Sequence, residues 1–410
     1  VASCYGFLQR LGYDPFPWAE RESDVYTQLP ATFGNPNYAA HALALVVLMA
    51  LYLTVSGRLW CAVFLPVFLV HLHLTGQRGS QVALLAAAVL ITVTAVVARK
   101  ITSPRRAIPV IVAITVLLGA VAAGGAMAVC KARTGTMFPL DESLLLRYNS
   151  YAGAARMILD RPVLGYGPGN YVIDNAPYWT PYEQRWFAEQ RMMNEHVHND
   201  LLEFGVEGGL LLSLIYLALF VLSIGYALLL AQTAETRKER LLGYFFSAFL
   251  TTYFVDGLFG FNVRVPVSAA LLFVVLGLLE GRLPTTSVAP ASHAPRFRVH
   301  ARTLVAVVLV LFLVRDGLFF VSQFQLMRGR GLANAHRFEE AHAVLAKAER
   351  KAGWNWRIPY EQGRTYILER EPGRARDAFA RTLTRNPNYV MTHVYLGRAC
   401  MEAVIDAQSK

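Results

Sequence analysis

The chain alternates long apolar blocks with short polar connections. Eight of these blocks approach the roughly 20 helical residues that cross a bilayer, and they span residues 38–55, 59–75, 79–98, 107–129, 202–231, 241–260, 266–281 and 303–321. This pattern predicts an all-α, polytopic membrane protein with about eight transmembrane helices in this chain. Residues 1–37, rich in proline, aromatic and charged residues, predict a loop, and because the chain begins at Val1 we expect an N-terminal truncation.

Composition agrees with this class, and the basic residues orient the chain. Hydrophobic residues make up 55% and charged residues 16%, against about 45–50% and 25% in soluble domains. Lys and Arg concentrate in three connections that the positive-inside rule assigns to the cytoplasm, namely residues 99–107, 235–240 and 280–302. The net charge of +11 fits this orientation and need not imply nucleic-acid binding.

The remaining connections fall on the periplasmic face and divide the chain. We expect a periplasmic first segment, transmembrane helices, a periplasmic catalytic loop, further transmembrane helices and a periplasmic tail: residues 1–37, 38–129, 130–200, 201–322 and 323–410. In the tail, "RFEEAHAVLAKAER" (337–350) is similar to "GRARDAFARTLTRNPNYV" (373–390). Helix pairs that recur at about 34 residues resemble tetratricopeptide repeats, which would offer a surface to a protein partner. An unrelated helical hairpin is the alternative.

The connection over residues 130–200 is the longest outside the apolar blocks. Loops beyond about 12–15 residues are usually functional or disordered, and this one contains many Tyr, Trp, Phe and Met residues, which disordered segments lack. Its apolar spacing predicts a helix up to Leu159 that Pro162 terminates, followed by turns at Gly165, Gly167 and Gly169. We therefore expect an ordered, functional loop.

Titratable residues stand at the end of this loop, in "NEHVHNDLLEF" (194–204). Asp200 and Glu203 fit an N-cap and capping-box pair for a helix that starts near Leu201. His198 then precedes the helix N-terminus, whose dipole disfavours an imidazolium. A neutral histidine can accept a proton near pH 7, so His198 is a candidate general base. The alternatives are that His198 only caps or packs, and that its neighbour His196 is structural.

Arginines supply the second part of a candidate site on the same face. Arg78 follows a tight turn between two apolar blocks, Arg147 lies in the predicted loop helix, and Arg264 lies in the last periplasmic turn. Guanidinium groups bind phosphate oxygens through paired hydrogen bonds, so converging arginines could hold a diphosphate. Each arginine could instead be an anchor that reaches the membrane interface.

Four segments of the chain resemble the O-antigen ligase family, which shares a fold with some O-antigen polymerases and protein O-oligosaccharyltransferases. They are "TFGNPNYAAHALAL" (32–45), "TGQRGSQVALL" (75–85), "LRYNSYAGAARMILDRPVLGYGPGNY" (146–171) and "HVHNDLLEFGVEGG" (196–209). They occur in the family's order, and the resemblance covers about residues 32–283.

The resemblance implies a metal-independent, inverting glycosyl transfer without a cofactor. A glycan would move from an undecaprenyl or other polyprenyl diphosphate carrier to a hydroxyl of a lipid core, as in lipopolysaccharide biosynthesis, of a growing polysaccharide or of a protein. Carried over by motif, His198 is the base and Arg78 and Arg147 bind the diphosphate, with Arg264 beside them. The secondary candidates are His196, Asn199, Asn35, Asn37, Tyr38 and Arg161.

The chain departs from the family pattern in two ways. The family's usual first helices are missing, so we expect part of the lipid groove to be missing as well. Plain lipopolysaccharide ligases lack the repeat tail, which would recruit a protein or cell-wall acceptor, so the acceptor stays open. Functions of other classes also remain. A transporter of lipid-linked glycan would need ionisable groups near the middle of the membrane, which these apolar blocks largely lack. A membrane-anchored scaffold that acts through its repeats would leave the histidines and arginines unexplained.

Overall fold

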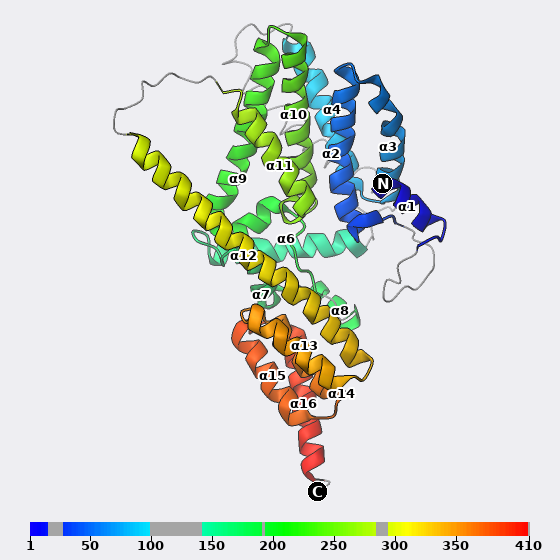
Figure 1. Ribbon diagram of the computed structural model, residues 1–410, viewed down its shortest axis with the longest axis vertical. Helices are drawn as coiled ribbons and strands as arrows, with labels where there is room; N and C mark the ends of the chain where they lie inside the picture. The colour runs from blue at the N-terminus through cyan, green and yellow to red at the C-terminus, as the bar shows by residue number, and fades with distance from the viewer. Residues whose placement is uncertain (15–27, 99–141, 191–192, 284–293, 409–410) are drawn as a thin grey trace. The chain divides into compact units, whose positions relative to one another are not determined.

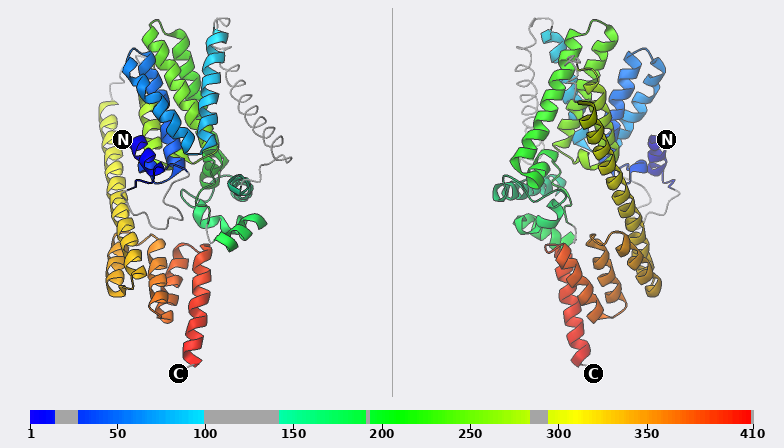
Figure 2. Two further views of the ribbon diagram at one scale, coloured as in Figure 1. Left: turned by 90° about the vertical axis from the view of Figure 1, so that its right-hand side faces the viewer. Right: turned by 60° about the vertical axis from the view of Figure 1, so that its left-hand side comes forward.

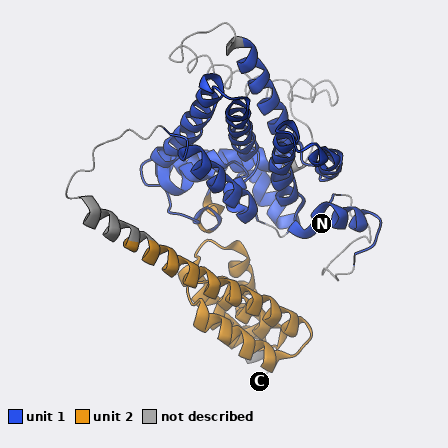
Figure 3. Cartoon of the chain, turned by 45° about the horizontal axis from the view of Figure 1, so that its top comes forward, with its two compact units in different colours: residues 1–172, 178–283 blue, residues 173–177, 284–410 orange. Residues whose placement is uncertain are grey.

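The computed structural model of the protein describes residues 1–14, 28–98, 142–190, 193–283 and 294–408 (Figure 1). These residues form helices joined by turns and loops, with no β-strand among them, which confirms the predicted all-α class. The chain divides into two compact units: residues 1–172 with 178–283, and residues 173–177 with 284–410 (Figure 3). The last apolar helix therefore groups with the C-terminal helices rather than with the other expected transmembrane helices.

Helices cover seven of the eight apolar blocks; the block at 107–129 lies outside the described residues. Four helical stretches are long and apolar enough to cross a membrane: Pro36–Val55, Arg78–Val96, Asp200–Thr233 and Ala306–Asn334. They belong to α2 (Pro36–Val55), α4 (Arg78–Ala98), α9 (Asp200–Thr233) and α12 (Ala294–Asn334). The helix α3 (Phe64–Leu74) with its preceding 3-10 turn, and α11 (Pro266–Glu280), are shorter apolar helices, and α10 (Arg237–Gly257) begins with four charged residues. The protein is an integral membrane protein.

The core of the first unit lies between α9, α10, α2, α4 and α11. Large buried side chains such as Phe220, Phe246, Phe249 and Tyr253 pack there, and each is about 1% exposed or less. Leucines on the outer side of α9 are exposed, among them Leu211, Leu214 about one turn further on, and Leu222 about three turns further on. An apolar outer surface around a packed bundle is what a lipid environment allows, because lipid chains cover it.

Several helix ends meet at one end of this bundle. The N-terminal ends of α2 and α4, the segment just before α9 and the C-terminal end of α10 contribute residues to one pocket there. Helix α6 (Glu142–Asp160) crosses the bundle at this end and is seen nearly end-on in the left panel of Figure 2. It ends at Asp160, as the sequence predicts from Pro162. Its buried face packs on the segment before α9 through residues Ala154, Met157, Val197 and Val206.

The glycine-rich loop after α6 is joined to a kink in α9. At Gly209 the helix departs from helical geometry (φ 72°, ψ −177°), and the carbonyls of Val206 and Glu207 accept hydrogen bonds from the loop amides of Tyr166 and Gly167, both at 2.8 Å. A Cβ atom on Gly209 would lie 2.3 Å from the Val163 carbonyl oxygen. The glycine is therefore required by both backbone conformation and space.

The second unit continues from α12 through four further helices: α13 (Phe338–Lys351), α14 (Arg357–Leu368), α15 (Pro372–Arg385) and α16 (Val390–Gln408). The helices coincide with the similar segments of the sequence, and Ala341 and Ala378 are both fully buried. His336 and Arg370 hold the same left-handed conformation in the turns before α13 and α15 (φ 57° and 64°). The assignment of these helices to tetratricopeptide repeats stays a prediction.

The remaining elements are short. The first unit contains α1 (Ala2–Arg10), α8 (Pro181–Gln190) and the 3-10 turns Ala31–Phe33, Leu59–Val63 and Asn262–Arg264. Helix α7 (Tyr171–Asp174) and the 3-10 turn Ala176–Tyr178 include residues that group with the second unit. The turn Asn262–Arg264 forms part of the connection from α10 to α11, which closes one side of the pocket.

Candidate functional site

A small polar pocket lies where the helix ends of the first unit meet. It is lined from α2, the α3–α4 turn, α6, the segment before α9 and the α10–α11 connection, by Asn37, His41, Gln77, Gly79, Ser80, Arg147, His198, Asp256, Phe259, Gly260 and Phe261. Its free volume is about 10 Å³, close to the least that one water molecule needs. The structure therefore brings titratable groups together around a space of about one water molecule.

His198 occupies this pocket in a constrained backbone position. Its φ of +61° is in the left-handed region, which is unusual for a residue with a side chain, and its carbonyl lies 2.9 Å from the Tyr151 hydroxyl. The next residue, Asn199, is the N-cap of α9, because its side chain accepts a hydrogen bond from the Leu202 amide at 3.0 Å. The predicted N-cap Asp200 is wrong by one position: both residue types cap helices well, and Asp200 is instead the first, buried residue of the helix.

The surroundings of His198 keep its ring neutral. Burial, and then the positive charge of Arg147 and the neighbouring His196 and His41, lower the pKa of His198 to about 3. A neutral ring can accept a proton, as we expected from the helix dipole, but such a low pKa makes it a weak base. An anion bound beside Arg147 would raise the pKa again, because it would favour the charged ring.

Arg147 is the predicted arginine that the structure brings to His198. It extends from α6 into the pocket lining, and its charge acts on both His198 and Tyr151. Burial raises the pKa of Tyr151 to about 12 although Arg147 opposes this. Arg147 forms no ion pair with any carboxylate of the described chain. Its guanidinium is therefore available to an anionic ligand.

Arg78 stands at the edge of the same pocket. Its neighbours Gln77, Gly79 and Ser80 line the pocket, but the Arg78 side chain is exposed and is not part of the lining. Within the described part of the chain it has no hydrogen bond or ion pair. The structure thus joins Arg147 with His198 and leaves Arg78 outside, at the start of α4.

Arg264 is engaged by two buried glutamates. It pairs with Glu207 and lies 3.4 Å from Glu203, and although burial lowers the pKa of Arg264, these two carboxylates raise it by more. Glu203 accepts from the Val197 amide at 3.0 Å and lies 2.9 Å from Nδ1 of His196. This arrangement gives Arg264 a structural task, which is to hold the glutamates that hold the His196–His198 segment.

Some of the secondary candidates line the pocket, and others have structural contacts elsewhere. Asn37 lines the pocket, whereas Asn35 is the N-cap of α2. The rings of Tyr38 and His196 both contact Phe261, with His196 stacked at 4.4 Å between centroids. Arg161 lies over the ring of Tyr166 at 4.4 Å and is not a lining residue.

The sequence interpretation did not single out several lining residues, above all His41, Asp256 and Phe261. His41 Nδ1 lies 2.6 Å from Asp256 Oδ2, and Phe261 contacts the rings of His41, His196 and His198. His41 was present in the motif at 32–45, and Asp256 is an acidic residue at the end of an apolar block. An ionisable residue inside an apolar helix is the signal that could have identified both.

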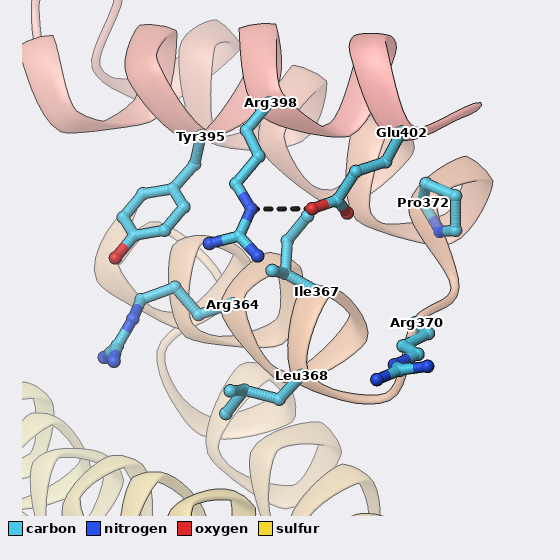
Figure 4. A pocket seen from close by; sticks show the side chains of 8 residues that line it. All are labelled: Arg364, Ile367, Leu368, Arg370, Pro372, Tyr395, Arg398 and Glu402. Atoms are coloured by element: carbon cyan, nitrogen blue, oxygen red, sulfur yellow. Dashed lines mark hydrogen bonds and ion pairs between the residues drawn. The ribbon is translucent and has the colours of Figure 1, made fainter. Parts of the chain in front are cut away.

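A larger cavity exists in the second unit. It has a volume of about 500 Å³ and lies between α14 and α16, where Arg364, Arg370 and Arg398 contribute to its lining (Figure 4). Arg364 pairs with Glu361 at 2.9 Å, and Arg398 pairs with Glu402 at 2.7 Å. No histidine is among the described residues that line it. Volume alone would make this cavity the candidate site. The smaller pocket, however, combines the neutral His198 with Arg147, which has no carboxylate partner in the described chain.

Metal chemistry was not expected from the sequence. Within the described ranges, no three His, Cys, Asp or Glu side chains are grouped as a metal site would require. The residues that do converge, namely a neutral imidazole and an unpaired guanidinium, can accept a proton and stabilise an anion.

Comparison with known proteins identified one family. The model of the O-antigen ligase family matches residues 61–217, a range that contains Arg78, Arg147, His196 and His198. His41, Asp256, Phe261 and Arg264 lie outside the matched range. Neither a curated protein nor a solved structure matched the chain.

Proposed function

Because the model of the O-antigen ligase family matches residues 61–217, we propose that this chain transfers a glycan from a polyprenyl diphosphate carrier to an acceptor hydroxyl, as a member of that family. The observation that carries the proposal is the shared pocket of His198 and Arg147, in which a possible base lies beside a cation that no described carboxylate neutralises. A glycosyl transfer with a diphosphate leaving group needs both functions.

The diphosphate is the part of the donor that this pocket would recognise. Arg147 presents a planar guanidinium that suits two phosphate oxygens, and the N-terminal ends of α2, α4 and α9 contribute positive partial charges at the same place. Arg78 at the edge of the pocket would meet the diphosphate only after a movement of its side chain or of the α3–α4 turn. Exposed leucines along α9 offer an apolar surface for the polyprenyl chain.

His198 would act on the acceptor. The acceptor oxygen attacks the anomeric carbon, the bond between that carbon and the phosphate oxygen breaks, and the proton of the hydroxyl passes to the free nitrogen of His198. Attack from the face opposite the leaving group inverts the anomeric configuration. The lipid diphosphate leaves with the bonding electrons, and Arg147 stabilises its charge, a role that cations fill in other phosphate-leaving reactions.

The low pKa of His198 couples the two halves of the reaction. Without donor, burial and then the charge of Arg147 hold the pKa of His198 near 3. A diphosphate would bring negative charge beside Arg147 and so raise the pKa of the ring. The base would then operate only when the donor is in place, which would limit unproductive proton transfer.

The pocket must widen before catalysis, because about 10 Å³ holds no sugar. The glycine-rich loop and the α9 kink lie next to the His198 segment and are linked to it through Glu203, Glu207 and Arg264. Closure around a bound substrate is a common step in enzymes of this kind of chemistry. We assign the reaction to the periplasmic face of the inner membrane, from the distribution of basic connections in the sequence.

Loss of the protein in its native bacterium tests this function. We expect the surface glycan to decrease and the polyprenyl-linked glycan to accumulate, and a wild-type copy to restore both. The purified protein should retain activity in excess EDTA, because arginine takes the place of a metal cation. Unchanged surface glycan and unchanged lipid-linked pools would contradict the proposal, and the identity of the lost glycan conjugate would show whether lipid, polysaccharide or protein is the acceptor.

A further inference from the structure

The pocket contains a second histidine that the proposed mechanism leaves unused. His41, on the second turn of α2, is 5% exposed and lines the pocket with Arg147 and His198. Its Nδ1 lies 2.6 Å from Oδ2 of Asp256, which is 2% exposed and stands near the end of α10. Ionisable groups inside membrane helices are costly and usually functional, so this buried pair requires an explanation.

Asp256 is held by three donors. Ser80 Oγ donates to Oδ1 at 2.9 Å, and Asn262 Nδ2 lies 3.2 Å from Oδ2. The same Asn262 nitrogen also donates to the Tyr253 carbonyl at 3.2 Å, which fixes the orientation of the amide. His41 Nδ1 is the third donor when that nitrogen carries the hydrogen.

The other ring nitrogen of His41 has no such partner. Nε2 is buried and makes no hydrogen bond to the described residues. Gly260 covers this edge of the ring: a Cβ there would lie 2.9 Å from Nε2 and 2.6 Å from Cε1. A larger residue at position 260 would therefore displace the His41 ring from its place in the pocket lining. His41 and Arg147 line the same pocket, and His41 contributes to it a ring nitrogen that has no partner among the described residues.

His71 shows that a buried ring nitrogen without a partner does not by itself indicate a ligand-binding histidine. It is fully buried on α3, and its Nε2 also lacks a partner among the described residues. Its Nδ1, however, lies 3.0 Å from the Ser3 hydroxyl rather than from a carboxylate, and it does not line the pocket. The two features specific to His41 are thus its carboxylate partner and its place beside Arg147.

We propose that His41, oriented by Asp256 and protonated on both ring nitrogens once the donor lipid is bound, donates a hydrogen bond from Nε2 to a phosphate oxygen of that lipid. Arg147 and His41 then bind the diphosphate from two sides, while His198 remains available to the acceptor. His41 keeps both protons during the transfer, and no covalent bond changes at its ring in that step. Asp256 is a positioning residue, because it acts on the donor through His41. This inference rests on the proposed function, since it assigns the anion that the same pocket binds.

Binding of two matched lipids tests the assignment. A polyprenyl diphosphate and the uncharged polyprenol of equal length are titrated into the purified full chain, its His41→Gln variant and the control His71→Gln. Glutamine can still donate to Asp256, which preserves the buried hydrogen bond. We expect His41→Gln to weaken diphosphate binding by about tenfold or more, as the loss of a hydrogen bond to a charged group does. Polyprenol binding should not change, and His71→Gln should bind both lipids like the wild type.

Two further variants protect the test against a folding defect. Gly260→Ala keeps His41 and Asp256 but displaces the ring, so it should reproduce the selective loss. Asp256→Asn removes the charge behind His41 and should weaken diphosphate binding, again without an effect on polyprenol. Equal weakening of both lipids would assign His41 a structural role and overturn the proposal.

The remaining outcomes separate this inference from the proposed function. A wild-type protein that binds polyprenyl diphosphate no better than polyprenol would contradict the proposed donor itself. Selective binding by the wild type that His41→Gln fully retains would contradict only the role of His41. A large fall in the transfer rate at saturating donor, with unchanged affinity, would make His41 a proton carrier and likewise overturn the assignment.

Discussion

The pocket of the first unit and the arginine-lined cavity of the second unit differ in what their charges already bind. In the larger cavity, Arg364 and Arg398 pair with glutamates of their own helices, Glu361 and Glu402. In the smaller pocket, Arg147 has no carboxylate partner in the described chain, and one histidine is neutral at its side. The number of arginines and the cavity volume therefore identify a candidate site less well than an arginine that has no carboxylate partner in the described chain.

Arg264 and Arg147 in the first unit differ in the same way: one has acidic partners within the described chain and the other has none. Arg264 is held by Glu203 and Glu207, and it stabilises the segment that carries His198. Arg147 is held by no acidic group of the described residues, although both arginines were predicted to bind diphosphate. An arginine with internal partners organises the site, and an arginine without them is left for the substrate.

The largest effect is expected from His198→Ala. Loss of a general base typically lowers a rate by about 10²–10⁴-fold, so glycan transfer by the purified protein should fall by that amount while the melting temperature stays close to wild type. His196→Ala should be milder, because His196 contacts Glu203 and Phe261 and does not line the pocket. Near wild-type transfer by His198→Ala would remove the base assignment.

Gly209→Ala should destabilise the kink that links α9 to the glycine-rich loop. The new Cβ would lie 2.3 Å from the Val163 carbonyl oxygen at a φ of +72°, and backbone strain of this kind costs about 1–3 kcal/mol. Thermal unfolding in detergent measures the loss. Gly225→Ala on the same helix is the matched control, because no heavy atom lies within 4 Å of its Cβ and its φ is ordinary. Equal melting temperatures for both variants would show that the kink tolerates a side chain.

Much of the fold was accessible from the sequence because it depends on local patterns. The apolar blocks predict the helices, and Pro162 predicts the end of α6 two residues before it. The N-cap of α9 was misplaced by one residue because Asn199 and Asp200 are both good capping residues, and only the backbone geometry distinguishes them. The grouping of α12 with the C-terminal helices has no local signal.

The candidate site was accessible only in part, because its contacts are distant in sequence. The pair of His41 with Asp256 joins residues 215 positions apart, and neither lies in a stretch rich in polar residues. Whether an arginine forms an ion pair depends on carboxylates from other segments of the chain. The sequence therefore could not distinguish Arg147 from Arg264, which pairs with two glutamates. Motif similarity identified His198 and Arg147, and the packing of helix ends supplied Asp256, Phe261 and Ser80.

The pH dependence of stability should carry a signature of His198. Its pKa is about 3 in the folded protein and 6.5 ordinarily, so between these values the unfolded chain binds the additional proton. The free energy of unfolding therefore falls as the pH is lowered from 6.5 towards 3. His198→Gln has no titratable ring at this position, so its melting temperature should fall less on acidification than that of the wild type. Parallel curves for the two proteins would contradict the neutral, buried state of His198.

The smallest effect is expected in the second unit. Arg398→Ala removes an exposed pair with Glu402, four residues further along α16, and pairs of this type contribute about 0.3–0.5 kcal/mol. Transfer activity should match wild type, and the melting temperature should shift only slightly. A strong loss of transfer by Arg398→Ala would give the larger cavity a part in the reaction and reverse the comparison of the two regions.

The affinity for a polyprenyl diphosphate in the variants Arg147→Ala and Arg398→Ala tests the central claim most directly. Both changes remove one arginine from a cavity lining, but only Arg147 lacks a carboxylate partner in the described structure. The account predicts that Arg147→Ala weakens binding by about tenfold or more, that Arg147→Lys recovers only part of it because the planar fork is lost, and that Arg398→Ala binds like the wild type. Unchanged affinity in Arg147→Ala, or a loss in Arg398→Ala alone, would contradict the assignment of the diphosphate to the pocket of His198.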